Sequence, residues 1–440
     1  MKIKLLLIFL FIVGFNTFSQ SDVYYFKDTN SSFSYKDIDT VDFKPLHKQV
    51  LERHSKATFW FKVLENETDI DYIFRINNIR AINVHAYQKN KEISKLSNQR
   101  YISFKFSRKD PVYIKASSNF SSYFPVELST IEEATFTEKV QLSINGFYYG
   151  VTFLVIIFSI NYYCFFKNVA FLYHAFLLIS ISFSFVIFDG LLNVFNVDQK
   201  IIEFLILLDY ILLSYTSLKF GNSFVLLDKY FQGAKKYTFG LFLIIVLFVI
   251  LFIIFRINEF YIILSVLTLL LLFIYWFLGI LLFNKNNYTK LFVFSFAISL
   301  FSGLDFFVLK NFGVSLFETN ATNLKMGGFL QIIVLSFAVL FREKDLRRYN
   351  FFMKNEIIKF SKEIKHLTTQ EELLKVDLDN LSLREREIFN LIVSSKSNKE
   401  IASEVNISVN TVKFHVKNIY LKLDIKNRKE ALTIKKVIKH

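Results

Sequence analysis

Seven long apolar runs between residues 144 and 341 constrain this chain more than any other feature. Each run is close to the roughly 20 residues that an α-helix needs to cross the hydrocarbon core of a bilayer. Backbone polar groups find no water in lipid, so each run is predicted to be a transmembrane helix. The predicted spans are residues 144–166, 169–188, 201–220, 237–255, 260–283, 290–309 and 325–341.

The start of the chain and the loop charges predict how these spans are oriented. Residues 1–19 have a basic start, an apolar core and a small-x-small ending, as in a secretory signal peptide. An uncleaved N-terminal anchor is the alternative. The loops predicted to be cytoplasmic hold seven lysines, whereas the outer loops hold four basic residues, Lys200, Arg256, Lys310 and Lys325. After the last span come Arg342, Lys344, Arg347 and Arg348, which we interpret as a basic stop just inside the membrane. We therefore predict a multi-pass protein of a bacterial inner membrane, with an extracytoplasmic N-terminal domain and a cytoplasmic C-terminal domain.

Residues 20–142 are polar overall and contain short runs in which apolar and polar residues alternate. That period of two is typical of half-buried β-strands. The predicted strands are residues 58–64, 72–76, 82–87, 101–106 and 112–116. Turn signals at Asn77-Asn78, Lys89-Asn90 and Lys109-Asp110-Pro111 separate them. This pattern predicts an antiparallel β-sandwich, which we interpret as a sensor domain.

Residues 342–380 read as a polar helix with an apolar seam at alternating spacings of four and three. The seam consists of Leu346, Met353, Ile357, Phe360, Ile364, Leu367, Leu374, Leu378 and Leu381, with Asn350 and Glu371 at its polar positions. This heptad pattern predicts a coiled-coil linker that joins two copies of the chain. One alternative is a single amphipathic helix packed on another part of the protein. In another, Thr368-Thr369 followed by Glu371-Glu372 caps a new helix and interrupts the coil.

Residues 381–440 hold the clearest local pattern, which predicts four short helices. Ser382 with Glu385 and Ser397 with Glu400 have the spacing of capping boxes that open the first two. Ser408 is placed to cap the third helix. The buried stripe of that helix is predicted to be Val409, Val412, Val416, Ile419 and Leu423.

The opposite face of the third helix is polar and basic, as entry into a DNA major groove requires. Lys413 and Lys417 lie one turn apart on this face, next to Phe414. Contacts that position the DNA backbone are predicted for Lys399, Ser408, Asn410, Thr411 and Asn418. Residues 381–440 hold 13 Lys and Arg against 6 Asp and Glu, so the chain's positive net charge of +15 is concentrated where double-stranded DNA would bind.

Three motifs make this segment resemble the LuxR-type helix-turn-helix family. They are Leu381-Ser382-Leu383-Arg384-Glu385, Asn398-Lys399-Glu400-Ile401-Ala402 and Thr411-Val412-Lys413-Phe414-His415. Residues 427–431, at the start of the predicted fourth helix, also fit the family. The segment departs from the pattern at Leu383, where the family often has Pro or Glu. The resemblance implies that Lys413, Phe414 and Lys417 face the bases and that the fourth helix contributes to dimerisation.

The order of the parts resembles a second family, the bacterial seven-transmembrane receptors with diverse intracellular signalling modules. The resemblance includes Gly146-Phe147-Tyr148-Tyr149-Gly150 in the first span and Leu335-Ser336-Phe337-Ala338 in the last. It implies a jelly-roll-like all-β ectodomain that binds carbohydrate or a related ligand. Kinases or cyclases are the family's usual outputs, whereas this chain ends in the LuxR-type module.

Three ionisable residues fall within the predicted spans, His174, Asp209 and Asp305. Such groups are costly in lipid and often functional. We interpret them as hydrogen-bonding partners between helices, or as the lining of an internal cavity, rather than as an ion pathway. No motif for a catalytic residue, a cofactor or a metal site is present. The chain is therefore predicted not to be an enzyme and to need neither cofactor nor metal.

The predicted architecture is multi-domain, in the order signal peptide (1–19), β-sandwich sensor (20–142), seven-helix bundle (143–341), coiled-coil linker (342–380) and all-α helix-turn-helix domain (381–440). The favoured function is that of a homodimeric, membrane-anchored receptor that converts an unknown extracytoplasmic signal into transcription. A transporter with a fused regulatory tail is the main alternative. A tethered factor released by proteolysis is a third.

Overall fold

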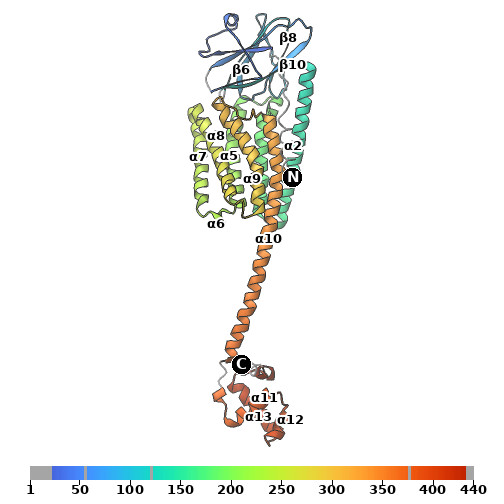
Figure 1. Cartoon of the computed structure of the whole chain (residues 1–440), viewed down its shortest axis with the longest axis vertical. Coiled ribbons are helices and arrows are strands. Elements are labelled where there is room, and N and C mark those ends of the chain that lie inside the picture. The colour runs from blue at the N-terminus through green and yellow to red at the C-terminus, as the bar shows by residue number, and fades with distance from the viewer. Residues whose placement is uncertain (1–21, 54–56, 119–121, 375–377, 433–440) are drawn as a thin grey trace. The chain divides into compact units, whose positions relative to one another are not determined.

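The computed structural model describes residues 22–53, 57–118, 122–374 and 378–432, with the backbone alone for 369–374. The chain forms two compact units, Met1–Glu343 and Lys344–His440. The first contains a β-domain and a helical bundle, and the second contains the C-terminal helices (Figure 1). The predicted signal peptide, residues 1–19, lies outside the described residues.

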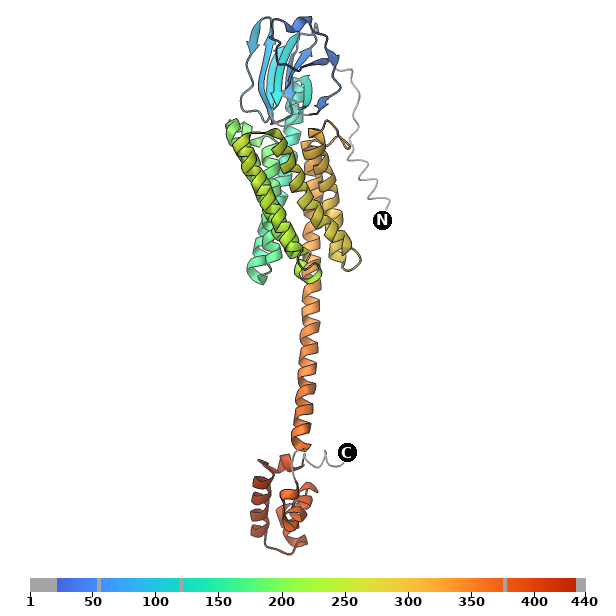
Figure 2. The ribbon, with the colours of Figure 1, turned by 90° about the vertical axis from the view of Figure 1, so that its left-hand side faces the viewer.

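The β-domain consists of two antiparallel sheets, which confirms the predicted all-β fold (Figure 2). One sheet has the strand order β2-β1-β4-β9-β6-β7 and the other β3-β10-β5-β8. The strands are β1 (Val23–Asp28), β2 (Lys44–Pro45), β3 (Gln49–Glu52), β4 (Thr58–Val63), β5 (Asp71–Ile76), β6 (Ala81–Gln88), β7 (Lys91–Ile93), β8 (Ile102–Ser107), β9 (Val112–Ser118) and β10 (Ser122–Thr130). Phe59, Phe61, Phe74, Phe104 and Phe124 are fully buried in its core.

Five of these strands were not predicted, namely β1, β2, β3, β7 and β10. Three of them, β2, β3 and β7, have two to four residues, too few to display a period. β10 contains Pro125, which argues against a strand within a sheet. Pro125 nevertheless pairs with Gln49 at the end of the β3 pairing, and the next residue, Val126, donates its backbone N–H to the Lys48 carbonyl.

Among the described residues, seven helices are long and apolar enough to cross a membrane, as predicted. They are α2 (Ile131–Phe166), α3 (Val169–Phe188), α5 (Gln199–Phe224), α7 (Ala234–Phe255), α8 (Asn258–Leu281), α9 (Asn287–Gly303) with the π turn η2 (Leu304–Val308) and the 3-10 turn η3 (Leu309–Asn311), and α10 (Ala321–Leu374). Two short helices, α4 (Leu191–Val194) and α6 (Leu227–Tyr230), lie in the connections. Large apolar side chains such as Phe153 and Leu154 are exposed, as expected for a surface that faces lipid.

The first helix of the bundle begins earlier than predicted. α2 starts at Ile131, directly after β10, and Thr130 with Glu133 forms a capping box there. The predicted boundary at residue 142 therefore falls inside a helix. The first three turns of α2 carry Glu132, Glu133 and Glu138, so hydropathy alone could not reveal them.

The last helix of the bundle extends well beyond the predicted span. α10 continues to Leu374, and the Thr368 hydroxyl donates to the Ile364 carbonyl inside it. The predicted cap at Thr368-Thr369 is therefore wrong, because a helix-interior bond uses the Thr368 side chain. Leu378 lies in a separate turn, η4 (Leu378–Asn380), and with Leu381 it packs into the C-terminal core instead of continuing the seam. Glu371 and Leu374 belong to the stretch 369–374, of which the structure describes the backbone alone.

Three helices and the start of a fourth form the C-terminal domain, as predicted. They are α11 (Leu383–Val393), α12 (Asn398–Glu404), α13 (Val409–Lys422) and a helical stretch over residues 428–432. Both predicted capping boxes are formed, and Ser408 caps α13. The core consists of side chains such as Ile388, Ile392, Ile401, Val412 and Ile419.

Two glycines hold the β-domain against the bundle. Gly190 (φ +70°) and Gly313 (φ +75°) lie in connections of the bundle, and each packs on the backbone of the β-domain. A Cβ on Gly190 would overlap the Arg100 carbonyl, and one on Gly313 would lie 2.6 Å from the Arg53 backbone nitrogen. Phe312, next to Gly313, also forms a β-bridge with Arg53.

Gly313→Ala should loosen the contact between the β-domain and the bundle. The left-handed conformation costs an L-residue roughly 1–2 kcal/mol, and the overlap with Arg53 adds to that. We expect a lower Tm of the purified protein and faster protease cleavage next to residue 131. Gly240→Ala is the matched control, because nothing lies within 4 Å of its added Cβ. If Gly313→Ala behaves like Gly240→Ala, the close approach is not needed for docking.

Candidate functional site

The exposed face of α13 carries the residues predicted to read DNA bases. Lys413, Phe414 and Lys417 are all exposed, and Phe414 is 61% exposed. Within the described residues neither ammonium group has a hydrogen-bond or ion-pair partner, so both are free to meet a phosphate or a base edge. The apolar stripe on the other side of α13, centred on Val412 and Ile419, fixes this orientation.

The residues predicted to position the DNA backbone lie around the start of α13 and on α12. Lys399, Ser408, Asn410 and Thr411 are exposed, and Asn418 is half-buried. The Ser408 hydroxyl accepts from the Thr411 N–H at 3.1 Å and lies 2.8 Å from the Thr411 hydroxyl. Both hydroxyls are thus part of the helix cap, which leaves Lys399 and Asn410 as the freer side chains of the set.

Glu385 is a buried carboxylate of the C-terminal domain that contacts two of its helices. It is 5% exposed, lies 2.6 Å from the Lys422 ammonium group of α13, and accepts from the Ser382 backbone N–H at 2.8 Å. The hydrogen bond from Lys422, followed by the one from Ser382, lowers the pKa of Glu385 to about 2. One carboxylate therefore caps α11 and ties it to α13.

Glu385→Gln should make the C-terminal domain less stable at neutral pH, by about 1 kcal/mol for the lost charge-assisted bonds. The wild-type carboxylate has a lowered pKa, so its contribution is complete above pH 4.5 and is lost as pH falls toward 2. Thermal unfolding followed by circular dichroism between pH 2 and 7 measures this. The two proteins should converge at the acid end. An equal difference at every pH would contradict the assignment.

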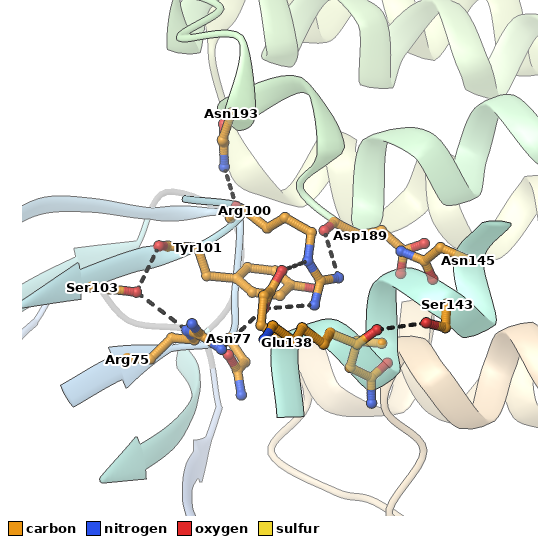
Figure 3. Close-up of polar contacts among 12 residues, drawn as sticks. Arg75, Asn77, Arg100, Tyr101, Ser103, Glu138, Ser143, Asn145, Asp189 and Asn193 are labelled. Carbon is orange, nitrogen blue, oxygen red and sulfur yellow. Dashed lines mark hydrogen bonds and ion pairs between the residues drawn. The ribbon is translucent and has the colours of Figure 1, made fainter. Parts of the chain in front are cut away.

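A buried cluster of charges joins the β-domain to the bundle (Figure 3). Arg75 of β5 and Arg100 before β8 both bind the carboxylate of Glu138, which lies on α2. Arg75 donates to Glu138 at 3.1 Å, and Arg100 donates to both of its oxygens. The side chains of both arginines are 6% exposed. This forked geometry is strong and directional, so it fixes how the sheet sits on α2.

The cluster continues through Asp189 to the last helix of the bundle. Arg100 donates to the backbone carbonyl of Asp189 at 3.3 Å, and Tyr149 donates to its carboxylate at 3.3 Å. Lys325 of α10 forms an ion pair with Asp189 and a hydrogen bond with Asn145 of α2. Asp189 and Lys325 have side chains that are 3% and 1% exposed. Four elements of the chain therefore meet at one buried ion pair.

The three ionisable residues predicted within the spans are all buried. Nδ1 of His174 lies 3.0 Å from the Ser159 hydroxyl, and Asp209 accepts from the Ser184 hydroxyl at 2.6 Å. Asp209 also lines a small cavity of about 110 Å³. Asp305 accepts from the Ser315 hydroxyl and from the backbone N–H groups of residues 316 and 319. Asp305 therefore holds the connection between η3 and α10 in place.

Two families match this chain in different segments. Residues 141–342 match the family described as 7TM diverse intracellular signalling, and residues 379–434 match bacterial regulatory proteins, luxR family. Against the spore germination protein GerE of Bacillus subtilis, 52 residues are 50% identical, covering 12% of this chain and 70% of GerE. The chain belongs to the luxR family of bacterial regulatory proteins.

Other luxR-type relatives are similar only in the C-terminal domain. The putative HTH-type transcriptional regulator YhjB of Escherichia coli is 47% identical over 64 residues, covering 14% of this chain and 32% of YhjB. The transcriptional regulatory protein LiaR of Bacillus subtilis is 47% identical over 53 residues, covering 12% of this chain and 25% of LiaR. The chain thus spans about a third or less of these relatives. It combines a seven-helix membrane signalling domain with a LuxR-type DNA-binding regulator.

Sequence reasoning did not find the buried charge cluster above the bundle of this luxR-family protein. Lys310 and Lys325 were interpreted as outer loop charges, yet they are only 2% and 1% exposed. Arg342 was interpreted as part of a basic stop at the membrane surface. It is instead buried, and its guanidinium donates to the carbonyls of Ser223 and Phe224 at the end of α5. Both lysines stand at the edge of a predicted span, and a charge count cannot distinguish such a residue from one in a loop.

Proposed function

We propose that this protein is a homodimeric one-component receptor of the bacterial inner membrane, which binds double-stranded DNA through α13 in response to an extracytoplasmic ligand. The exposed, uncompensated pair Lys413 and Lys417 beside Phe414 carries the proposal. These residues share a chain with seven membrane spans and an all-β domain. The β-domain would be extracytoplasmic and the C-terminal domain cytoplasmic, and carbohydrate is the ligand class that the family resemblance favours. The protein would act by binding alone, without catalysis.

The seam of α10 supports the dimer. Ile357, Ile364 and Leu367 are 64%, 62% and 55% exposed, with Phe360 between them. A single chain that left such a stripe in water would lose the stabilisation that burying it offers. A second copy of the same helix presents the matching stripe, and the heptad spacing fits parallel pairing. Dimerisation would bring two DNA-binding domains together for two half-sites.

Contacts at both ends of the membrane part of α10 support a route for the signal. At one end Lys325 binds Asp189, which Arg100 of the β-domain also contacts. At the other end Arg342 binds backbone carbonyls of α5, and Glu343 accepts from Asn168. A ligand that favours one arrangement of the β-domain would thereby bias the position of α10.

Ile357→Lys should abolish the dimer, because it places a charge in the seam. Ile358→Lys is the matched control, since Ile358 is also exposed, at 44%, but lies outside the seam. Light scattering of the purified protein gives the mass of each variant. We expect a monomer for Ile357→Lys, a dimer for Ile358→Lys, and loss of reporter transcription for the first only. A dimer in both variants would place the contact elsewhere.

Reporter transcription in cells tests the whole proposal, with Lys413 and Lys417 replaced by alanine. An immunoblot of the same cells with an antibody against the C-terminal domain shows whether the full-length protein or a released fragment is present during transcription. A soluble fragment of the size of the C-terminal domain would favour the release of a tethered factor. Unchanged transcription in the alanine variant would remove α13 from the mechanism.

A further inference from the structure

A large cavity lies between the β-domain and the ends of α9 and α10 that face it. Its volume is about 1280 Å³, and its lining comes from β5, β10, the loops beside β6 and β8, and the segment from α9 to α10. Pockets for small organic ligands commonly measure about 300–1,000 Å³. The cavity is therefore large enough for a ligand with two chemically different parts.

The charged part of the cavity lining is basic. The charged residues that line the cavity are Lys48, Arg75, Arg80, Arg100 and Lys310, against Glu127 and Glu318. Arg75 and Arg100 also share Glu138, which neutralises part of their charge. The remaining excess favours a negatively charged group inside the cavity.

Lys310 is the residue whose charge most needs a partner. It is 2% exposed, its ammonium group lies 3.9 Å from the centre of the Tyr123 ring, and it donates to the Thr319 carbonyl. In the part of the chain that is described, no carboxylate lies within ion-pair distance of it. Asp305, one turn before it, uses its oxygens to accept from Ser315 and from backbone N–H groups. Burying an ammonium group that has no carboxylate in ion-pair contact is costly, and an anion in the cavity would reduce that cost.

The opposite wall of the cavity is apolar and belongs to the membrane spans. It includes Ala297, Ile298 and Phe301 of α9, and Met326 and Leu330 of α10. Phe301, Met326 and Leu330 are each 40% exposed, so the cavity continues onto a surface that faces lipid. A neutral sugar would leave this wall without apolar contacts and Lys310 without a counter-ion. An alkyl chain would cover the wall.

We propose that this cavity binds an anionic amphiphile, with its carboxylate or phosphate at Lys310 and its acyl chain between α9 and α10. A free fatty acid and a lysophospholipid share this chemistry. Binding itself stands apart from the proposed receptor function, and only its effect on transcription rests on that function. The ligand touches the connection that leads into α10, next to the cluster that contains Lys325.

Photolabelling of the full-length protein in nanodiscs of phosphatidylcholine, a zwitterionic lipid without net charge, tests the site. The probe is palmitate with a diazirine near the end of its chain, and mass spectrometry locates the label. We expect labelling of peptides around residues 297–301 and 326–330. Unlabelled palmitate and palmitoyl lysophosphatidate are the two competitors, and the stronger one identifies the source of the head group. Octyl glucoside, glucuronate and inorganic phosphate should compete poorly.

Three variants make the test specific. Lys310→Met should weaken palmitate competition about 10-fold or more, the ratio expected when a charge-assisted contact is lost. Ala297→Trp should block labelling by filling the apolar side while leaving Lys310 in place. Lys200→Met is the matched control, because Lys200 is exposed and does not line the cavity.

Three results would overturn the proposal. They are unchanged competition in Lys310→Met, equal competition by glucuronate or phosphate, and stronger competition by octyl glucoside. A reporter assay with added palmitate separates the two claims. Specific labelling without any change in transcription keeps the site and contradicts its coupling to transcription. A transcriptional response that survives Lys310→Met and Ala297→Trp keeps the receptor function and contradicts the site.

Discussion

Replacing both Lys413 and Lys417 with alanine should reduce DNA affinity by about 100-fold or more at 0.15 M salt. Each lysine is expected to contribute roughly 1–3 kcal/mol through contacts to a base edge or phosphate. Their side chains make no hydrogen bond or ion pair with another described residue, so the fold should remain. Fluorescence anisotropy of full-length protein in nanodiscs, with operator DNA selected from the genome, gives the affinity.

Two further variants show whether the loss comes from specific recognition. Lys413→Arg with Lys417→Arg keeps the charge and should retain most non-specific binding. Lys399→Ala should weaken binding to all DNA sequences equally. It should also make the plot of log binding constant against log salt concentration less steep, by about one unit of slope. If the double alanine variant binds the operator as tightly as wild type, α13 is not the reading helix.

Lys325→Met should be the most destabilising single change in the membrane unit, at about 3–5 kcal/mol. It removes the cation from a buried ion pair and leaves the Asp189 carboxylate behind. The Tm of the purified protein in nanodiscs measures the loss. The double variant Lys325→Met with Asp189→Asn should recover most of it, because neither position of that ion pair then carries a buried charge. A single variant as stable as wild type would show that Asp189 is already neutral in the folded protein.

The pH dependence of the Lys325→Met variant gives a second readout. Burial raises the pKa of Asp189, and Lys325 opposes this rise. Without Lys325 the pKa rises further, so the carboxyl takes up a proton more readily in the folded state. A raised folded-state pKa adds stability at low pH that is lost as pH rises through it. The destabilisation should therefore shrink as the pH is lowered, and the Asp189→Asn double variant should not show this change.

Local patterns predicted the elements whose neighbours in sequence decide their structure. The apolar runs require helices, because lipid offers no hydrogen bonds to the backbone. The capping boxes at Ser382 and Ser397 are closed by residues three positions away, so their spacing was sufficient. The face of α13 that bears Lys413 and Lys417 followed from the helical period. The start of α2 and the end of α10 did not follow from the sequence, because the polar turns at these ends resemble loops.

The sequence alone thus determined the membrane spans and the DNA-binding helices, whose hydrogen bonds close within a few residues. It also determined those strands of the β-domain that are long enough to show a period of two, although their pairing is not local. Only the tertiary structure decided which charges meet. Arg100, Glu138, Asp189 and Lys325 come from four separate elements. Lys310 likewise meets Tyr123 only because β10 packs on η3. Residues far away in the chain decide whether such a charged side chain is solvated, is paired or can bind a ligand. A local sequence pattern carries no information about those residues.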